Sequence, residues 1–217
     1  VHAQIQDRLA VTHVDQVFHN PFDFQVEGIY TFQLPEGAII TDLVLWIGER
    51  RVQGQIMESL DARRTYDEIV GRRIDPALVE RVDDQLFRLS VFPFPASGTR
   101  RVEIEYMEVL DATAGVTDYV YPLAADATGT RVGLFRFTAD VKSQIPFDLE
   151  LPTAFVRAAV ERDDGQQASI FWDEEEWSPD QDLIVHIKEE KILVQPRILS
   201  YPPTDRSMGY YVMWMPP

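Results

Sequence analysis

The sequence predicts a mainly β protein: an antiparallel β-sandwich with one short helix at about residues 59–70, followed by a second β-rich segment. Two observations support this fold class. Most of the chain consists of short runs in which apolar and polar residues alternate, and these runs are rich in β-branched and aromatic residues. Pro, Gly and Asn separate the runs at short intervals, as turns between strands do. With 217 residues, 45% of them hydrophobic, the chain can form one large β domain or two small ones.

The first part of the chain contains four predicted strand regions. Asn20-Pro21 and the segment from Pro35 to Ala38 are predicted turns between them, because these residue types favour turn geometry. Alternation of polar and apolar residues predicts a half-buried strand pair in the first region and single strands in the others: residues 3–19, 24–34, 39–47 and 51–57.

Residues 58–80 break this pattern. Tyr66 and Ile69 recur at roughly helical spacing with charged residues between them, and Gly71 is suited to end a helix. Asp75 precedes a proline and is therefore expected to leave helical geometry. We expect the helix to cap one open end of the sandwich.

After this segment, strand patterns resume and continue to the end of the chain. Residues 86–92 and 100–109 are predicted to form a hairpin closed around Ala96-Ser97-Gly98. Residues 113–118 are predicted to be a boundary, which divides the chain into segments 1–112 and 113–217. Further strands are expected in the second segment at residues 119–123, 131–141, 147–151, 156–162, 168–172, 183–187 and 210–215.

Residues 11–110 contain an ordered series of motifs. They are Phe18-His19-Asn20, Glu27 to Pro35, Ala38 to Gly48, Val52-Gln53-Gly54, the helix positions Glu58, Ala62 and Tyr66, Asp75 to Glu80, Phe87 to Phe94, and Val102 to Leu110. In this order and spacing they resemble the vault protein inter-alpha-trypsin (VIT) domain. Gln33 stands where that family usually has proline.

The resemblance implies a function. VIT domains precede a von Willebrand A-type domain in inter-α-trypsin inhibitor heavy chains, and they also occur in a vault-associated ADP-ribosyltransferase and in bacterial exported proteins. Residues 119–123 and 209–213 resemble the β-rich connector that leads into the A-type domain. We therefore expect a non-catalytic structural and protein-interaction module of an exported or surface protein, whose A-type domain has been removed or lies beyond Pro217.

Two groups of residues are candidates for the interaction surface. The helix region could present a basic patch, although solvated side chains on a capping helix are the simpler interpretation: Arg63, Arg64, Arg72 and Arg73. A contiguous exposed apolar patch is expected near residues 210–215, where the next domain would sit: Tyr210, Tyr211 and Trp214.

Composition argues against several other partners. The net charge of −16 disfavours nucleic acid, and no run of residues is long and apolar enough for direct membrane insertion. No cofactor and no metal site are expected. The segment Asp205 to Gly209 lacks the metal-binding motif of A-type domains, and the four histidines lack zinc-site spacing. The acidic run Asp173 to Asp182 is expected to be a solvated loop, which leaves Ca²⁺ binding there open.

An enzyme is not expected, because the sequence contains neither a nucleophile-elbow motif nor a P-loop. The alternative function is that of a carbohydrate-binding or hydrolytic β-sandwich. It would use a platform of exposed aromatic side chains, with candidates Trp46, Trp172, Trp177 and Trp214. The exposure of Trp172 and Trp177 discriminates between the two functions.

Overall fold

The computed structural model describes residues 1–58, 77–82, 85–123, 131–152, 155, 157–190, 197–201 and 210–214. Within these residues the chain is mainly β and its sheets are largely antiparallel, which confirms the predicted fold class. The predicted helix at about residues 59–70 lies outside the described residues, as do Asp205 to Gly209.

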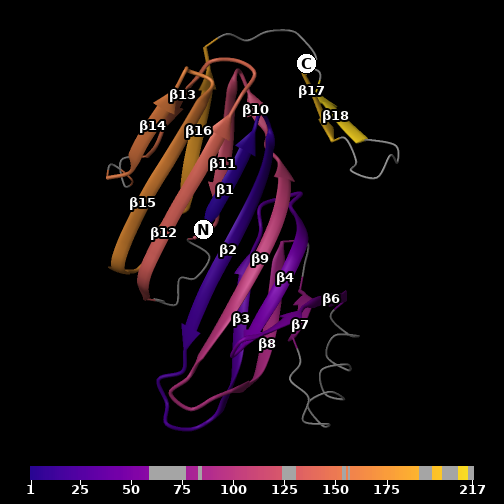
Figure 1. Cartoon of the computed structure of the whole chain (residues 1–217), viewed down its shortest axis with the longest axis vertical. Helices are drawn as coiled ribbons and strands as arrows, with labels where there is room; N and C mark the ends of the chain where they lie inside the picture. The colour runs from indigo at the N-terminus through magenta and orange to yellow at the C-terminus, as the bar shows by residue number, and fades with distance from the viewer. Residues whose placement is uncertain are drawn as a thin grey trace.

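An eight-stranded sheet runs the length of the molecule (Figure 1). Its order is β14-β15-β12-β1-β2-β9-β4-β5. The strands are β1 (His2–Gln6), β2 (Leu9–His19), β4 (Ile39–Ile47), β5 (Arg50–Gln53), β9 (Thr99–Val109), β12 (Val132–Lys142), β14 (Ala159–Asp163) and β15 (Gln167–Trp177). Strands from both sequence segments therefore belong to one sheet.

Two four-stranded sheets lie behind this large sheet in Figure 1. One has the order β3-β8-β7-β6 and is formed by β3 (Val26–Gln33), β6 (Gln55–Glu58), β7 (Ala77–Arg81) and β8 (Leu86–Phe94). The other has the order β10-β11-β16-β13 and is formed by β10 (Ala112–Thr113), β11 (Val116–Tyr121), β13 (Phe147–Glu150) and β16 (Leu183–Glu189).

One continuous core lies between the sheets. Tyr30 of β3 packs on Phe18 of β2 with 4.8 Å between the ring centroids, and Tyr119 of β11 packs on Phe137 of β12 at 6.2 Å. The buried hydroxyls of Thr12 and Tyr119 also share a hydrogen bond of 2.9 Å. Each small sheet thus buries its apolar side chains against the large one, as in a sandwich.

The pairing of β1 with β12 joins the two sequence segments. The two strands are parallel, with His2 opposite Thr138 and Gln6 opposite Lys142. The other edge of β1 pairs antiparallel with β2. Residues 113–118, predicted to be a boundary, form the end of β10, the turn that follows it and the start of β11. The division into segments 1–112 and 113–217 stays a prediction.

The predicted hairpin of residues 86–92 and 100–109 is wrong, because β8 and β9 belong to different sheets. Both edges of each strand already have other partners: β8 pairs with β3 and β7, and β9 with β2 and β4. Between β8 and β9 the chain crosses from one sheet to the other. Asn20 fixes this crossing, since its side-chain amide donates to the carbonyl oxygens of Pro95 and Phe24 at 2.9 and 3.0 Å.

Two other local predictions also differ from the structure. The single strand expected at residues 51–57 is divided at Gly54 into β5 and β6, which lie in different sheets. The acidic residues Asp173 to Glu176 do not form a loop; they continue β15, where Asp173 is opposite Arg136 and Glu174 is opposite Phe135. The ladder with β12 and inward-facing residues such as Trp172 hold Asp173 to Glu175 extended despite their charge.

Strands β17 (Arg197–Tyr201) and β18 (Tyr210–Trp214) form a separate two-stranded sheet. It is visible in yellow beside the upper end of the sandwich in Figure 1. The alternation of residues predicted a strand at 210–215, whereas β17 was not predicted.

Candidate binding surfaces

The two-stranded sheet of β17 and β18 exposes apolar side chains on both of its faces. Ile198 and Met213 are opposite each other in the register and are 53% and 47% exposed. Tyr211, on the same face, is 70% exposed, and Val212, on the other face, is 45% exposed. An isolated pair of strands is marginally stable in water, and exposed apolar clusters mark contact surfaces. We call these four residues the hairpin patch.

The candidate interaction residues from the sequence fall into two groups. Tyr211 lies in the hairpin patch, and the backbones of Tyr210 and Trp214 lie in the same strand. The four arginines of the proposed basic patch lie outside the described residues: Arg63, Arg64, Arg72 and Arg73.

A second candidate surface is a cleft of about 590 Å³ between the two halves of the sandwich. It lies where the turn after β3, the end of β9, the second half of β11 and the chain before β16 meet. Of the residues that the structure describes, five carboxylates and no Lys or Arg line it: Glu36, Glu108, Asp111, Asp118 and Asp182. We call this the acidic cleft.

Glu108 is the most buried of the five carboxylates, with 7% of its surface exposed. It occupies an inward-facing position of β9, in line with Ile104 and Tyr106. Its Oε1 atom is buried and has no hydrogen-bond partner among the described residues. Burial raises the pKa of Glu108 to about 7, because desolvation penalises the charged carboxylate.

Two other carboxylates of the acidic cleft already have partners. Asp182 Oδ1 accepts a hydrogen bond of 2.8 Å from the backbone N–H of Leu123. Asp118 Oδ1 lies 2.7 Å from Nδ1 of His186. In the part of the chain that the structure describes, no three His, Asp or Glu side chains are grouped so as to hold a metal ion.

A second cleft of about 640 Å³ is lined by residues of β1, β2, β12, β14 and β15. Its lining carries charges of both signs, including Asp140, Lys142 and Arg162. Two of these residues are engaged, since Ser169 donates to Asp140 at 2.9 Å and Arg162 donates to Asp148 at 2.5 Å. Because its charges are of both signs and two of the charged groups are already engaged, this cleft is a weaker candidate than the acidic cleft.

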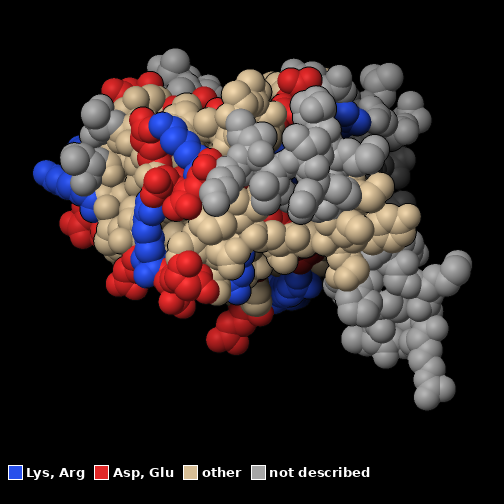
Figure 2. Space-filling view, turned by 90° about the horizontal axis from the view of Figure 1, so that it is seen from above, with Lys and Arg blue, Asp and Glu red and all other residues tan. Residues whose placement is uncertain are grey.

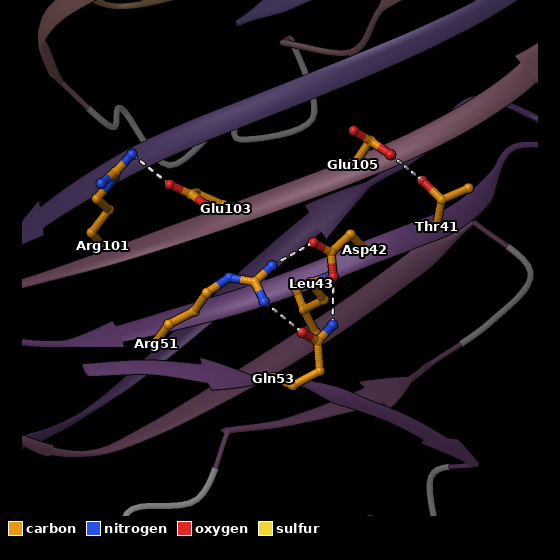
Figure 3. A network of polar contacts seen from close by, with 8 residues as sticks. All are labelled: Thr41, Asp42, Leu43, Arg51, Gln53, Arg101, Glu103 and Glu105. Atoms are coloured by element: carbon orange, nitrogen blue, oxygen red, sulfur yellow. Dashed lines mark hydrogen bonds and ion pairs between the residues drawn. The ribbon is translucent and has the colours of Figure 1, made fainter. Parts of the chain in front are cut away.

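A polar network covers the outer face of β4, β5 and β9 (Figure 3). Asp42 accepts hydrogen bonds from Arg51 at 2.8 Å, from the Gln53 amide and from the backbone of Leu43. These contacts lower the pKa of Asp42, with the Gln53 hydrogen bond contributing most. The network attaches the edge strand β5 to β4, which is a structural role.

The aromatic residues proposed as a sugar platform lie mainly in the core. Trp172 is 3% exposed, and half-buried Trp177 packs edge-on against it with 5.2 Å between the ring centroids. Trp46 is half-buried under the Arg101 guanidinium, 5.3 Å from the ring centroid. Among these three described side chains, no pair forms an open platform. The side chain of Trp214 lies outside the described set.

Acidic and basic side chains are interspersed on the face of the molecule shown in Figure 2. The described residues on this face form no broad basic area of the kind that phosphate backbones bind. Within the described residues, no helix is long and apolar enough to cross a bilayer.

Comparisons with known proteins agree with the motifs in the first half of the chain. The model of the Vault protein inter-alpha-trypsin domain matches residues 1–106. The mouse protein mono-ADP-ribosyltransferase PARP4 is 24% identical over 122 residues, which span 56% of this chain but 6% of the mouse protein.

The solved structure of a candidate nutrient binding protein from Legionella pneumophila is similar in fold, with a TM-score of 0.54 at 13% identity. The likeness covers 86% of this chain and 64% of the Legionella chain. Because residues 1–106 make up only about half of this chain, the similar fold extends into the second half.

Proposed function

Because residues 1–106 of this chain form a VIT domain, we propose that the chain is a non-catalytic interaction module that supports an adjacent von Willebrand A-type domain. The module would belong to an exported or surface protein. Its partner would be the A-type domain of the same polypeptide, held through the hairpin patch. The exposed apolar residues of β17 and β18 are the observation that carries this proposal.

The physical argument concerns the hairpin patch itself. Tyr211 and Met213 lie two residues apart on one face, and Ile198 extends the same face from the neighbouring strand. Tyrosine, methionine and isoleucine gain stability when a partner removes them from water, at about 25 cal/mol per Å² of apolar area. Large aromatic side chains also tend to dominate the energy of protein contacts. Covering this face would therefore stabilise both the sheet and its partner.

The proposal can be tested by hydrogen exchange in the full-length gene product. We expect the backbone amides of residues 197–201 and 210–214 to exchange slowly there and rapidly in the 217-residue chain. The double variant Tyr211→Glu/Met213→Glu should remove this protection, because two carboxylates would be placed in an apolar contact.

Val17→Glu is the matched control, since Val17 is 65% exposed on β2 and lies outside the hairpin patch. This variant should keep the protection of β17 and β18. Equal exchange rates of these strands in the long and short proteins would contradict the proposal. So would equal effects of the double variant and the Val17 control.

A further inference from the structure

The acidic cleft concentrates negative charge in a recess between the two halves of the sandwich. Among the described residues, its lining contains five carboxylates but no lysine or arginine. A recess lined by one sign of charge raises the local concentration of oppositely charged ligands. A volume of about 590 Å³ lies in the range of small-ligand sites.

Glu108 supplies an independent observation that points to a ligand. Only 7% of the residue is exposed, and its buried Oε1 atom has no hydrogen-bond partner among the described residues. A buried polar atom without a partner costs about 1–3 kcal/mol, and more when it is charged. An entering cation with N–H donors would remove this penalty.

The rest of the lining limits the kind of cation. Apolar side chains lie beside the carboxylates, as expected for a site that holds a hydrocarbon chain: Leu34, Pro35, Leu110, Val120 and Pro122. A metal ion needs several oxygens converging on one point, whereas Asp118 and Asp182 are engaged by His186 and Leu123. The lining therefore suits separated N–H donors on an aliphatic chain better than a point charge.

We propose that the acidic cleft binds an organic cation, an ammonium or guanidinium group on a short aliphatic chain, with Glu108 as its buried counter-ion. The cation could be a free amine or a Lys or Arg side chain of a protein segment, since both present the same chemistry. The site is separate from the hairpin patch, so either proposal can fail without the other.

The test is calorimetric titration of the 217-residue chain at pH 8 with cadaverine, agmatine and a blocked Gly-Lys-Gly peptide. 1,5-Pentanediol serves as the neutral analogue of cadaverine. We expect at least one cation to bind and the diol to show no binding. Glu108→Gln should weaken that binding at least tenfold, while Glu49→Gln should leave it unchanged. Glu49 is exposed and lies outside the cleft lining, so this control makes the same charge change.

The three ligands distinguish the two possible sources of the cation. Binding by the free amines assigns a small-molecule site, and binding by the peptide alone assigns a protein segment. If none of the three cations binds, or if both variants weaken binding equally, the proposal is wrong.

A pH series on the unmodified chain provides a measurement that does not depend on a variant. The cation should bind more weakly as the pH falls from 8 to 6, because Glu108 takes up a proton in this range. Among the described residues, the other charged or titratable groups near the cleft include Glu36, Asp111, Asp118 and Asp182, with His186 beside Asp118, the phenols of Tyr106 and Tyr119, and Arg8, which donates to the Leu110 carbonyl. Affinity that stays constant between pH 8 and 6 would overturn the role of Glu108.

Discussion

Glu108 shows how a single carboxylate can be placed where its charge is unfavourable. It lies near the end of β9 at an inward position. Burial raises the pKa of the phenols of Tyr106 and Tyr119, and the charge of Glu108 adds to this rise. Aliphatic residues fill the equivalent positions Val102 and Ile104. The protein therefore retains a polar group at a position where an apolar one would stabilise the fold, which is common at binding sites.

Replacing Glu108 with glutamine should change how stability depends on pH. The folded-state pKa of about 7 lies above the ordinary value of 4.5, so between these values the native chain holds a proton that the unfolded chain has released. Stability should therefore fall as the pH rises from 4.5 to 7, by roughly 3 kcal/mol for this group. Glu108→Gln removes this pH-dependent loss of stability, because glutamine does not titrate. In urea unfolding the variant should be similar to the unmodified chain at pH 4.5 and more stable at pH 8.

The exposed control Glu49→Gln should keep the pH dependence of the unmodified chain, because that carboxylate faces water. Parallel stability profiles of Glu108→Gln and the unmodified chain would show that Glu108 does not titrate near neutrality.

The sequence contained a signal for this residue. The alternation that predicts Val102, Ile104 and Tyr106 on the buried face of β9 also places Glu108 there, two residues further on. The alternation could not predict that β11 and the chain before β16 would complete a cleft around this carboxylate, because it specifies the face of a strand and not the partner that covers this face.

At the scale of elements, Gly54 allows the chain to pass from one sheet to another. It lies between β5 and β6, and its N–H donates to the Leu43 carbonyl at 2.8 Å. A Cβ atom at this position would lie 2.3 Å from Cδ2 and 2.7 Å from Cγ of Leu43, a side chain that is 3% exposed. The close approach of β4 to this crossing thus requires glycine.

Gly54→Ala should destabilise the chain by about 1–3 kcal/mol, because the added methyl group overpacks the core. The matched control Gly133→Ala should have little effect, since its nearest neighbouring atom would be 3.9 Å away. Urea unfolding measures the free energy of unfolding of both variants. In a Leu43→Ala background the cost of Gly54→Ala should shrink, because the clashing atoms are gone. An unchanged cost in that background would contradict the packing explanation.

The strands themselves were largely predictable, whereas their partners were not. Local alternation identified β2, β3, β4, β9 and β12 within a few residues. The turn Ala96-Ser97-Gly98 predicts a hairpin between β8 and β9, yet the neighbours β3, β7, β2 and β4 take both edges of each strand. Pairing between distant segments depends on the whole set of competing edges, which local patterns do not contain.

At the scale of the whole molecule, one core unites the two sequence segments. The buried cluster includes Ile5 and Tyr106 from the first segment and Phe137 and Val185 from the second. The buried Thr12–Tyr119 hydrogen bond also connects them. Contacts this extensive favour cooperative unfolding, even though the VIT match ends at residue 106.

Scanning calorimetry of residues 1–217 should therefore show one main transition, with calorimetric and van't Hoff enthalpies that agree. Ile5→Ala, at a site 2% exposed on β1, should lower the midpoint of that transition without splitting it. Two separate transitions, only one of which responds to Ile5→Ala, would instead indicate that the two segments fold independently.

The pairing of β1 with β12 has a consequence for the path to the native state. His2 and Thr138 are 136 residues apart in sequence, yet their side chains share a hydrogen bond of 2.9 Å. During synthesis, β1 must wait for most of the chain to emerge before its second edge finds a partner. Closing so long a loop slows folding and leaves a strand edge available to other chains. Refolding from denaturant should accordingly be slow and sensitive to protein concentration, with self-association competing until β12 reaches β1.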